Sequence, residues 1–362
     1  YWSASSQVSE ADASKEVATV TENIDAVLSH MREMNTRRLT TLGLLQKYSY
    51  DMVPNPPSLG GGAPGIIETA GLGAASLIPV VGVDNAGLVL PPGPSKADIP
   101  AVWKLDPAGY ANWDSTIKGF SRSLTSSLAV VGDLNKVDIP ANEKIQSFLG
   151  KLPSEPFPFS LDTVAAKRGE AVYNENCVGC HDPSRGRKRE AMVFDVQADP
   201  ARAIATKSFA VPILQKVVSS VCPQDQECTV VDPASNIGYV AGSLAGIWMQ
   251  SPYMHNGSVP TLRQLLVPAL RTSEPFLRGS ISYDVKNGGW EWDPAKEKSL
   301  REQGDVALSL HDISQSGMGN YGHGSVEQQF ISYDDSKLRI AWSDSEADKP
   351  VVDDLIAYLL SL

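Results

Sequence analysis

The chain has 362 residues, of which 42% are hydrophobic and 20% charged; this composition predicts two or more folded domains and excludes a disordered chain. Its 42 acidic residues outnumber the 31 basic ones, and the net charge of −11 argues against nucleic acid as a partner, whereas a basic protein would be attracted. No run of about 18 apolar residues occurs, so we expect no membrane-spanning segment.

The first 95 residues contain one helical pattern and a long irregular stretch. Between residues 9 and 37, apolar residues recur at spacings of three and four, which predicts an amphipathic helix. Residues 55–94 begin with NPPSLGGGAPG and end among further prolines, a composition that favours irregular chain. The first residue is Tyr1, with neither an initiator methionine nor a basic-then-apolar leader, so we expect a processed or partial chain.

Residues 96–158 are expected to form a second, short helical unit. SRSLTSSLAVVG (121–132) and ANEKIQSFLGKL (141–152) are its predicted helices. The proline-rich LPSEPFPFS (152–160) predicts an extended boundary after them, because proline and the residue before it both disfavour helix.

Two helices are predicted near the ends of the remaining segment, residues 159–362. LDTVAAKRGEAVYNEN (161–176) has Asp162 as its N-cap, and KPVVDDLIAYLLSL (349–362) has an apolar face. Gly169 allows two helices to approach closely, and Tyr173 and Tyr358 are suited to fill their crossing. We therefore expect these two helices to pack against each other.

The motif Cys177-Val-Gly-Cys180-His181 directly follows the first of these helices. Two thiols at this spacing can bond both vinyl groups of a haem, and the adjacent histidine then becomes the proximal iron ligand. A redox-active C-x-x-C pair would follow a strand instead, and a zinc site would need two more ligands at suitable spacing. The motif therefore predicts one covalently bound haem c between two crossed helices, as in a cytochrome c. Because covalent haem attachment takes place outside the cytoplasm, we expect a periplasmic or extracellular protein.

The other two cysteines, Cys222 and Cys228, lie in the polar stretch VCPQDQECTV, where a short surface loop is expected. In an oxidising compartment we predict a disulfide between them. Two separate thiols are the alternative, and their spacing does not favour a shared zinc site with the C-x-x-C-H motif.

Several residues are candidates for the second axial position of the iron. They are the histidines His30, His255, His311 and His323 and the thioethers of Met254 and Met318. His30 is most simply a surface residue, and His311 a satisfied polar residue near a turn. His255 follows Met254 in a turn bounded by prolines and a glycine, and His323 lies in the glycine-rich SGMGNYGHGS, which can approach a flat cofactor closely. Spacing alone does not decide between His323 and Met254.

The segment IWMQSPYMHNGSVPTLRQLL (247–266) resembles the signature that follows the second haem in the bacterial dihaem cytochrome c peroxidase superfamily. Further segments resemble the rubber-oxygenase-like branch of this superfamily and follow one another in the expected order. They are ADIPAVW (97–103), ANWDSTIKGFSRSLTSSLAVVG (111–132), RGEAVYNENCVGCH (168–181), EPFLRGSISYDVKNGGW (274–290) and GMGNYGHGS (317–325). The resemblance covers roughly residues 97–362. It implies a mainly α fold, with a cytochrome c-like haem domain over 159–362 preceded by a haem-free, loop-rich helical region.

The resemblance also implies a ligand set. The histidine of the branch's glycine-rich loop is the distal ligand of the C-terminal haem, which corresponds here to His323, and the proximal ligand corresponds to His181. Met254 and His255 would then pack by the haem edge or hydrogen-bond a propionate. Met254, Met318 and an open position remain alternatives to His323. A calcium ion is common in the superfamily, but no distinctive cluster of oxygen ligands identifies one here.

The sequence departs from the family in its upstream half, where residues 96–158 correspond to a degenerate linker or remnant of the first haem domain. Family members carry two haems, of which the upstream one reacts with oxygen or peroxide, whereas this sequence has a single C-x-x-C-H motif. We therefore expect a c-type cytochrome that passes electrons to a redox partner protein through a six-coordinate haem. One alternative is a peroxidase or oxygenase whose reactive haem lies in missing sequence or on a partner. Another is a haem-bearing subunit of a larger redox assembly.

Overall fold

A computed structural model of the chain describes residues 66–67, 96–105, 109–121, 124–125, 136–181, 193–206, 211–224, 228–230, 238–304, 308–324, 329–333 and 336–362. All of them belong to one unit, Pro57–Leu362. The helix predicted over residues 9–37 and most of the irregular segment 55–94 lie outside the described residues. Strand β1 (Ile66–Ile67) is the described part of that segment, and it pairs with β2 (Ala97–Asp98).

Helix α5 (Thr163–Asn176) leads into the short helix α6 (Val178–His181), which carries the end of the C-x-x-C-H motif. Asp162 begins α5 as predicted, because its carboxylate accepts hydrogen bonds from the backbone amides of Val164 and Ala165. This cap satisfies two of the amides that a helix start leaves without a partner.

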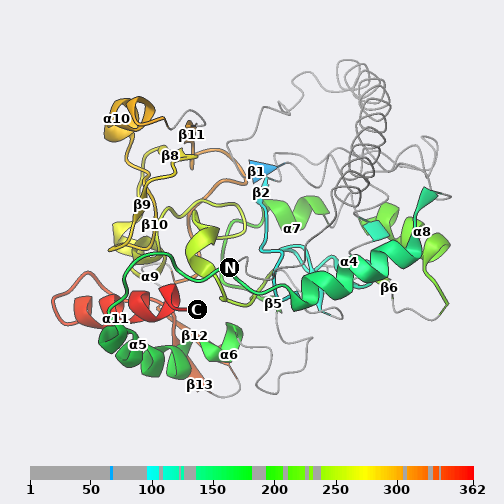
Figure 1. Cartoon of the computed structure of the whole chain (residues 1–362), viewed down its shortest axis with the longest axis horizontal. Coiled ribbons are helices and arrows are strands. Elements are labelled where there is room, and N and C mark those ends of the chain that lie inside the picture. Colours follow the sequence, from blue (N-terminus) through cyan, green and yellow to red (C-terminus); the bar gives the residue numbers. More distant parts are fainter. Residues whose placement is uncertain are drawn as a thin grey trace, which may run out of the picture. The chain divides into compact units, whose positions relative to one another are not determined.

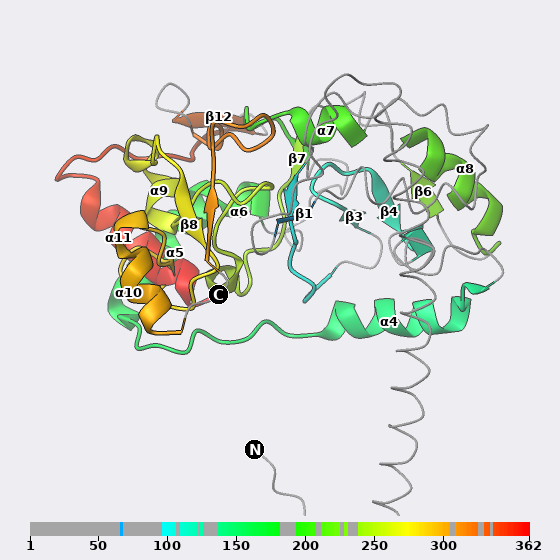
Figure 2. The same ribbon diagram turned by 90° about the horizontal axis from the view of Figure 1, so that it is seen from above.

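The C-terminal helix α11 (Lys349–Leu360) packs against α5, although the two are far apart in the sequence (Figures 1 and 2). Gly169 sits at the crossing, where an added Cβ atom would overlap the carbonyl group of Asp354. The rings of Tyr173 and Tyr358 fill the adjoining space, with centroids 5.1 Å apart. The predicted crossing of these two helices is therefore confirmed.

The main hydrophobic core lies between this helix pair and the segment 247–267. Val352, Leu355, Ile356 and Leu359 of α11 are almost fully buried. They meet the 3₁₀-helix η6 (Ile247–Gln250) and helix α9 (Leu262–Leu266). The first and last helices of the 159–362 segment are thereby joined to its middle.

Strands in the described part of the chain are short, at most four residues long, whereas the longer helices have eleven to fourteen residues. The fold is therefore mainly α, with small antiparallel sheets. The pairs are β5 (Val193–Phe194) with β7 (Tyr239–Val240), β8 (Phe276–Arg278) with β11 (Ser309–His311), β9 (Tyr283–Asp284) with β10 (Gly289–Trp290), and β12 (Phe330–Tyr333) with β13 (Ser336–Arg339). Sequence periodicity did not predict them, because strands of two to four residues are too short for a clear alternating pattern.

One three-stranded sheet connects residues before the motif with residues after it. Its order is β3 (Tyr110–Ala111), β4 (Ile117–Gly119) and β6 (Cys228–Val230). Thus part of the 96–158 segment is hydrogen-bonded to the 159–362 segment.

The remaining helices are α4 (Ile139–Lys151), α7 (Ala201–Ala205), α8 (Val211–Val221), η7 (Pro268–Leu270), η8 (Pro294–Lys296) and α10 (Glu297–Glu302). Helix α4 confirms the prediction for ANEKIQSFLGKL, and LPSEPFPFS after it is non-helical. Most of SRSLTSSLAVVG lies outside the described residues. No helix in the described ranges has both the length and the hydropathy of a membrane span.

Candidate functional site

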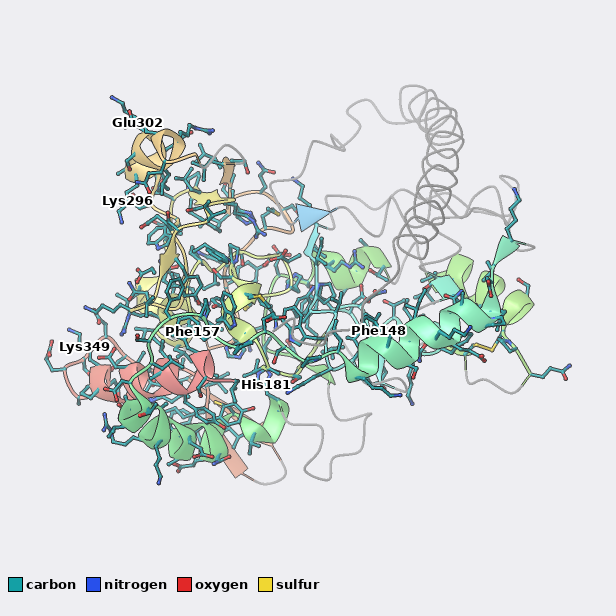
Figure 3. The ribbon with its side chains drawn as sticks, viewed as in Figure 1. Phe148, Phe157, His181, Lys296, Glu302 and Lys349 are labelled. Carbon is teal, nitrogen blue, oxygen red and sulfur yellow. A yellow bond between two sulfur atoms is a disulfide. The ribbon has the colours of Figure 1, made fainter. Side chains whose placement is uncertain are left out.

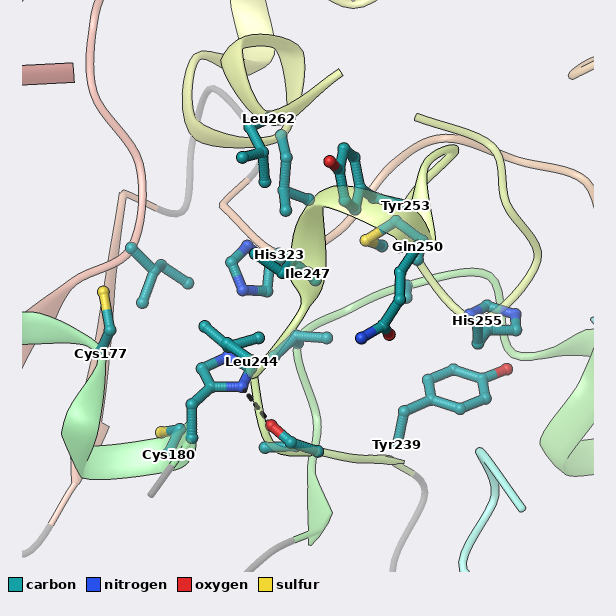
Figure 4. A pocket seen from close by; sticks show the side chains of 18 of the residues that line it. Cys177, Cys180, Tyr239, Leu244, Ile247, Gln250, Tyr253, His255, Leu262 and His323 are labelled. Carbon is teal, nitrogen blue, oxygen red and sulfur yellow. Dashed lines mark hydrogen bonds between the residues drawn. The ribbon is translucent and has the colours of Figure 1, made fainter. Parts of the chain in front are cut away.

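A largely apolar cavity lies next to the C-x-x-C-H motif (Figure 4). Its volume is about 1420 Å³, counting the solvent in its open mouth. Its walls are the end of α5 with α6, strand β7 and the loop after it, η6 and α9, the loop that carries His323, and residues near the C-terminus. Apolar side chains such as Val196, Leu244, Ile247, Leu265 and Trp342 make up most of these walls.

The chain places both motif thiols on this cavity. Cys177 is the C-cap of α5, and its carbonyl accepts hydrogen bonds of 2.9 Å from the amides of both Cys180 and His181. This extra helical turn puts positions three apart on one face, so Cys177 and Cys180 line the cavity together with His181. Neither thiol takes part in a disulfide, and burial, followed by the neighbouring Cys180, raises the pKa of the Cys177 thiol to about 12. A protonated thiol of this kind is unlike the thiolate of a redox-active C-x-x-C pair.

His181 ends α6 (Figure 3), and its imidazole is oriented by the backbone. Its Nδ1 lies 2.9 Å from the carbonyl oxygen of Gly242, in the loop after β7. A carbonyl only accepts hydrogen bonds, so Nδ1 carries the proton and the lone pair is on Nε2. A histidine that ligates a metal commonly has this arrangement, with one nitrogen held by a carbonyl and the other on the metal.

His323 reaches the same cavity from the glycine-rich loop. The backbone is left-handed at Gly322, His323 and Gly324, with φ angles of 91°, 45° and 80°. The amide of His323 donates to the carbonyl of Val196 at 2.7 Å, which holds the loop against the segment after β5. Among the described residues, Nδ1 of His323 is buried without a hydrogen-bond partner. Burial, followed by the positive charge of neighbouring groups, lowers the pKa of His323 to about 3, so the ring is neutral.

The distance between the two imidazoles fits a single metal ion held between them. The ring centroids of His181 and His323 are 6.3 Å apart. A metal–imidazole bond is about 2 Å long and the nitrogen lies about 1 Å from the ring centre, so two ligands on opposite sides of one ion place their centroids about 6 Å apart. A haem with its iron at this point would also have both motif thiols on the same cavity wall and apolar side chains around it. The residues present therefore fit a haem c.

The other candidates for the second axial position differ in where they lie. Met254 lines the cavity, with a left-handed φ of 74°, whereas Met318 is buried outside its walls. His311 is also away from the cavity, in β11. Its expected role as a satisfied polar residue near a turn is wrong, because within the described structure neither of its ring nitrogens has a partner. His30 lies outside the described residues.

His255 lines the far side of the cavity, where its ring stacks on that of Tyr239 with centroids 3.8 Å apart. Its Nε2 is buried and has no partner in the part of the chain that the structure describes. The same holds for the side-chain nitrogen of Gln250, and Figure 4 shows both residues at the cavity. Burial lowers the pKa of His255 to about 3, so it is a neutral ring. Sequence reasoning missed Tyr239 and Gln250, which carry no motif.

Cys222 and Cys228 form a disulfide with an S–S distance of 2.07 Å, which connects the end of α8 to β6. Bonded to each other, they are not ligands for a metal shared with the motif. In the described ranges, no group of three or more His, Cys, Asp or Glu side chains is arranged to hold a metal ion.

Comparison with known proteins connects this site to one class of domain. Residues 238–274 match a family model described as RoxA-like, cytochrome c-like. The matched segment contains β7, η6 and α9 and thus forms one wall of the cavity. The match supports a RoxA-like, cytochrome c-like domain in this part of the chain, and cytochrome c domains bind haem c.

Two curated relatives are themselves uncharacterised. The chain is 32% identical to the uncharacterized protein y4iM of Sinorhizobium fredii, over 75% of this chain and 65% of that protein. It is 28% identical to the uncharacterized protein y4iJ of the same organism, over 38% of this chain and 33% of that protein. The chain thus spans less than two thirds of the length of either relative.

Proposed function

We propose that the chain is a c-type cytochrome that transfers electrons through one covalently bound haem with His181 and His323 as axial ligands. The observation that supports this most is the 6.3 Å separation of the two rings across a cavity that also contains both motif thiols. When bound there, haem supplies a one-electron couple at its iron.

The chain's own groups have separate tasks in this proposal. Cys177 and Cys180 would hold the haem through thioether bonds, and the hydrogen bond from Nδ1 of His181 to Gly242 keeps that ring in one orientation. The apolar walls exclude water. If His181 and His323 both bound the haem iron, no coordination site would be left for oxygen or peroxide, which favours electron transfer over catalysis at this site.

The optical and EPR spectra of the ferric protein test the proposal. We expect low-spin iron that does not respond to cyanide or peroxide, and a high-spin fraction that binds them would contradict it. The variant His323→Ala should produce high-spin iron, because it removes one axial ligand. The control is His311→Leu, which changes a buried histidine outside the cavity and should leave the spectrum low-spin.

The second candidate function is a haem peroxidase or oxygenase whose reactive haem is carried by further sequence or by a partner. The RoxA-like match and the greater length of both relatives favour it. The number of haems per intact polypeptide, measured together with peroxide turnover, distinguishes the two functions. One haem without turnover supports the electron carrier.

The cellular location of the protein and the kind of partner it would have follow from the same proposal. We place it outside the cytoplasm, in the periplasm or beyond, because covalent haem attachment takes place there. Its partner would be a basic redox protein, since the chain has a net charge of −11, or the other subunits of a redox assembly. Measuring the reduction rate by a basic donor as salt is raised tests the first partner, because screening should slow an electrostatically guided encounter.

A further inference from the structure

Arg271 connects helix α9 to the loop that carries His323. It follows η7, and its guanidinium contacts backbone carbonyls from both segments. Nε donates to Gln264 at 3.1 Å, Nη1 donates to Asn320 and Gly322 at 2.8 Å each, and Nη2 donates to Leu265 at 3.1 Å and to His323 at 3.3 Å. A guanidinium has five N–H donors in a rigid planar arrangement, so every donor of Arg271 is used on main chain.

The charge of Arg271 is balanced only by these carbonyl groups within the described structure. Its side chain is partly buried, and none of the ion pairs in the described ranges includes it. Burying a charge costs free energy that an apolar side chain would not. The presence of Arg271 at this position is therefore better explained by the backbone groups that it binds than by side-chain packing.

The loop that carries His323 depends on the hydrogen bonds from Arg271 for its conformation. Residues 319–324 belong to no helix or strand, and His323 is a non-glycine residue at a positive φ of 45°, a conformation that is unfavourable for residues with a side chain. Arg271 binds three carbonyls of this loop, those of Asn320, Gly322 and His323. Its other two acceptors belong to α9, which is fixed in the main core.

We propose that Arg271 is a positioning residue that holds His323 at the axial position by fastening its loop to α9. The inference rests on the proposed function, since it concerns His323 as an iron ligand. The role requires the five-donor geometry and not only the charge. Lysine would supply a single charged group with three donors, which cannot reach five carbonyls in two segments.

The test compares the holoprotein with its Arg271→Lys and Arg271→Gln variants. Both should keep the covalent haem, because the hydrogen bonds of Arg271 go to neither Cys177 nor Cys180, but His323 should dissociate more readily. We expect the ratio of His323-bound to His323-free ferric iron to fall at least tenfold, which corresponds to about 1.4 kcal/mol. High-spin EPR intensity measures this ratio, and added imidazole should restore the low-spin spectrum by replacing the lost ligand.

The matched control is the Arg263→Lys variant. Arg263 lies in α9 and binds Asn287 and Asp353 instead of the loop that carries His323. This variant should remain low-spin. Low-spin spectra in both Arg271 variants would overturn the positioning role, as would variants that lose the haem altogether, because Arg271 would then support the whole fold. The proposed function fails by a different result: a high-spin wild-type protein, or an unchanged spectrum in His323→Ala.

Discussion

Gly322 controls how closely the His323 loop approaches the segment after β5. Its φ of 91° disfavours any residue with a side chain, and an added Cβ would overlap the backbone of Ala198. The hydrogen bond from the amide of His323 to Val196 needs this close approach. A single glycine therefore influences where the neighbouring imidazole lies.

We expect Gly322→Ala to destabilise the fold by about 1–3 kcal/mol through backbone strain and to raise the high-spin fraction as His323 moves. Urea unfolding and the ferric spectrum measure the two effects. Gly304→Ala is the control, because its φ of 102° imposes similar strain while an added Cβ meets nothing within 4 Å. If both variants shift the spectrum equally, or neither does, contact with Ala198 is not what places His323.

At the scale of elements, the α5–α11 crossing depends on Gly169. A methyl group there would meet the main chain of Asp354, which cannot rotate away as a side chain could. Separating the helices would also disturb the buried residues of α11, including Leu355 and Leu359.

Gly169→Ala should lower the free energy of unfolding by about 1–3 kcal/mol or more, even though alanine is the better helix former. Glu170→Ala serves as the control, since it changes the next, exposed position of the same helix. Urea unfolding monitored by circular dichroism gives both values. A Gly169→Ala variant as stable as the wild type would mean that the helices can move apart freely.

The β8–β11 pair buries an unusual histidine. His311 pairs with Phe276 across the two strands, and their ring centroids are 4.7 Å apart. Burial, followed by the positive charges of Arg278 and Lys96, lowers the pKa of His311 to about 3, while Asp312 opposes the shift. The folded protein therefore keeps this ring neutral.

This histidine should make the fold less stable in acid. The unfolded chain binds a proton near pH 6.5 and the folded protein only near pH 3. Stability from the neutral ring is thus fully present above pH 6.5 and decreases as the pH falls toward 3, by at most about 1.4 kcal/mol per pH unit. His311→Leu should remove this part of the pH dependence in urea unfolding without loss of stability above pH 6.5. An equally steep dependence in the variant would refute this role.

At the scale of the whole described structure, a buried ion pair joins the segment before the motif to a helix after it. Asp114, between β3 and β4, accepts a 2.8 Å bond from Nε of Arg202 in α7, and Thr206 donates to the same carboxylate. Asp114 is fully buried and Arg202 almost so. Removing one partner leaves a buried charge without compensation.

Asp114→Ala should therefore destabilise the protein by about 3–5 kcal/mol. Arg168→Ala is the comparison, because it breaks an ion pair with Asp354 at an exposed position and should cost much less stability. Thermal unfolding of both variants tests the difference. Similar losses of stability in the two variants would show that burial does not determine how much the Asp114–Arg202 ion pair contributes to stability.

Features of the site can be predicted from the sequence when they depend on residues that are neighbours in the chain. The C-x-x-C-H motif, the Asp162 cap and the α5 and α11 helices follow from neighbouring residues, and the structure contains this cap and both helices as predicted. Choosing His323 over Met254 required a family resemblance, because both residues lie in turns and both face the cavity. Nothing near Arg271 in the sequence indicates that it contacts a loop about fifty residues away.

Residue spacing is enough for thioether attachment and for helix formation, because both act over a few adjacent positions of one chain. It was enough here to predict a haem motif with a proximal histidine, and to predict the two helices that the structure shows to cross. The position of the second imidazole, the carbonyl that orients the first, and the arginine that holds the loop depend on contacts between distant segments. Such contacts arise only when the chain folds, since packing, and not any local pattern, brings their backbone groups together.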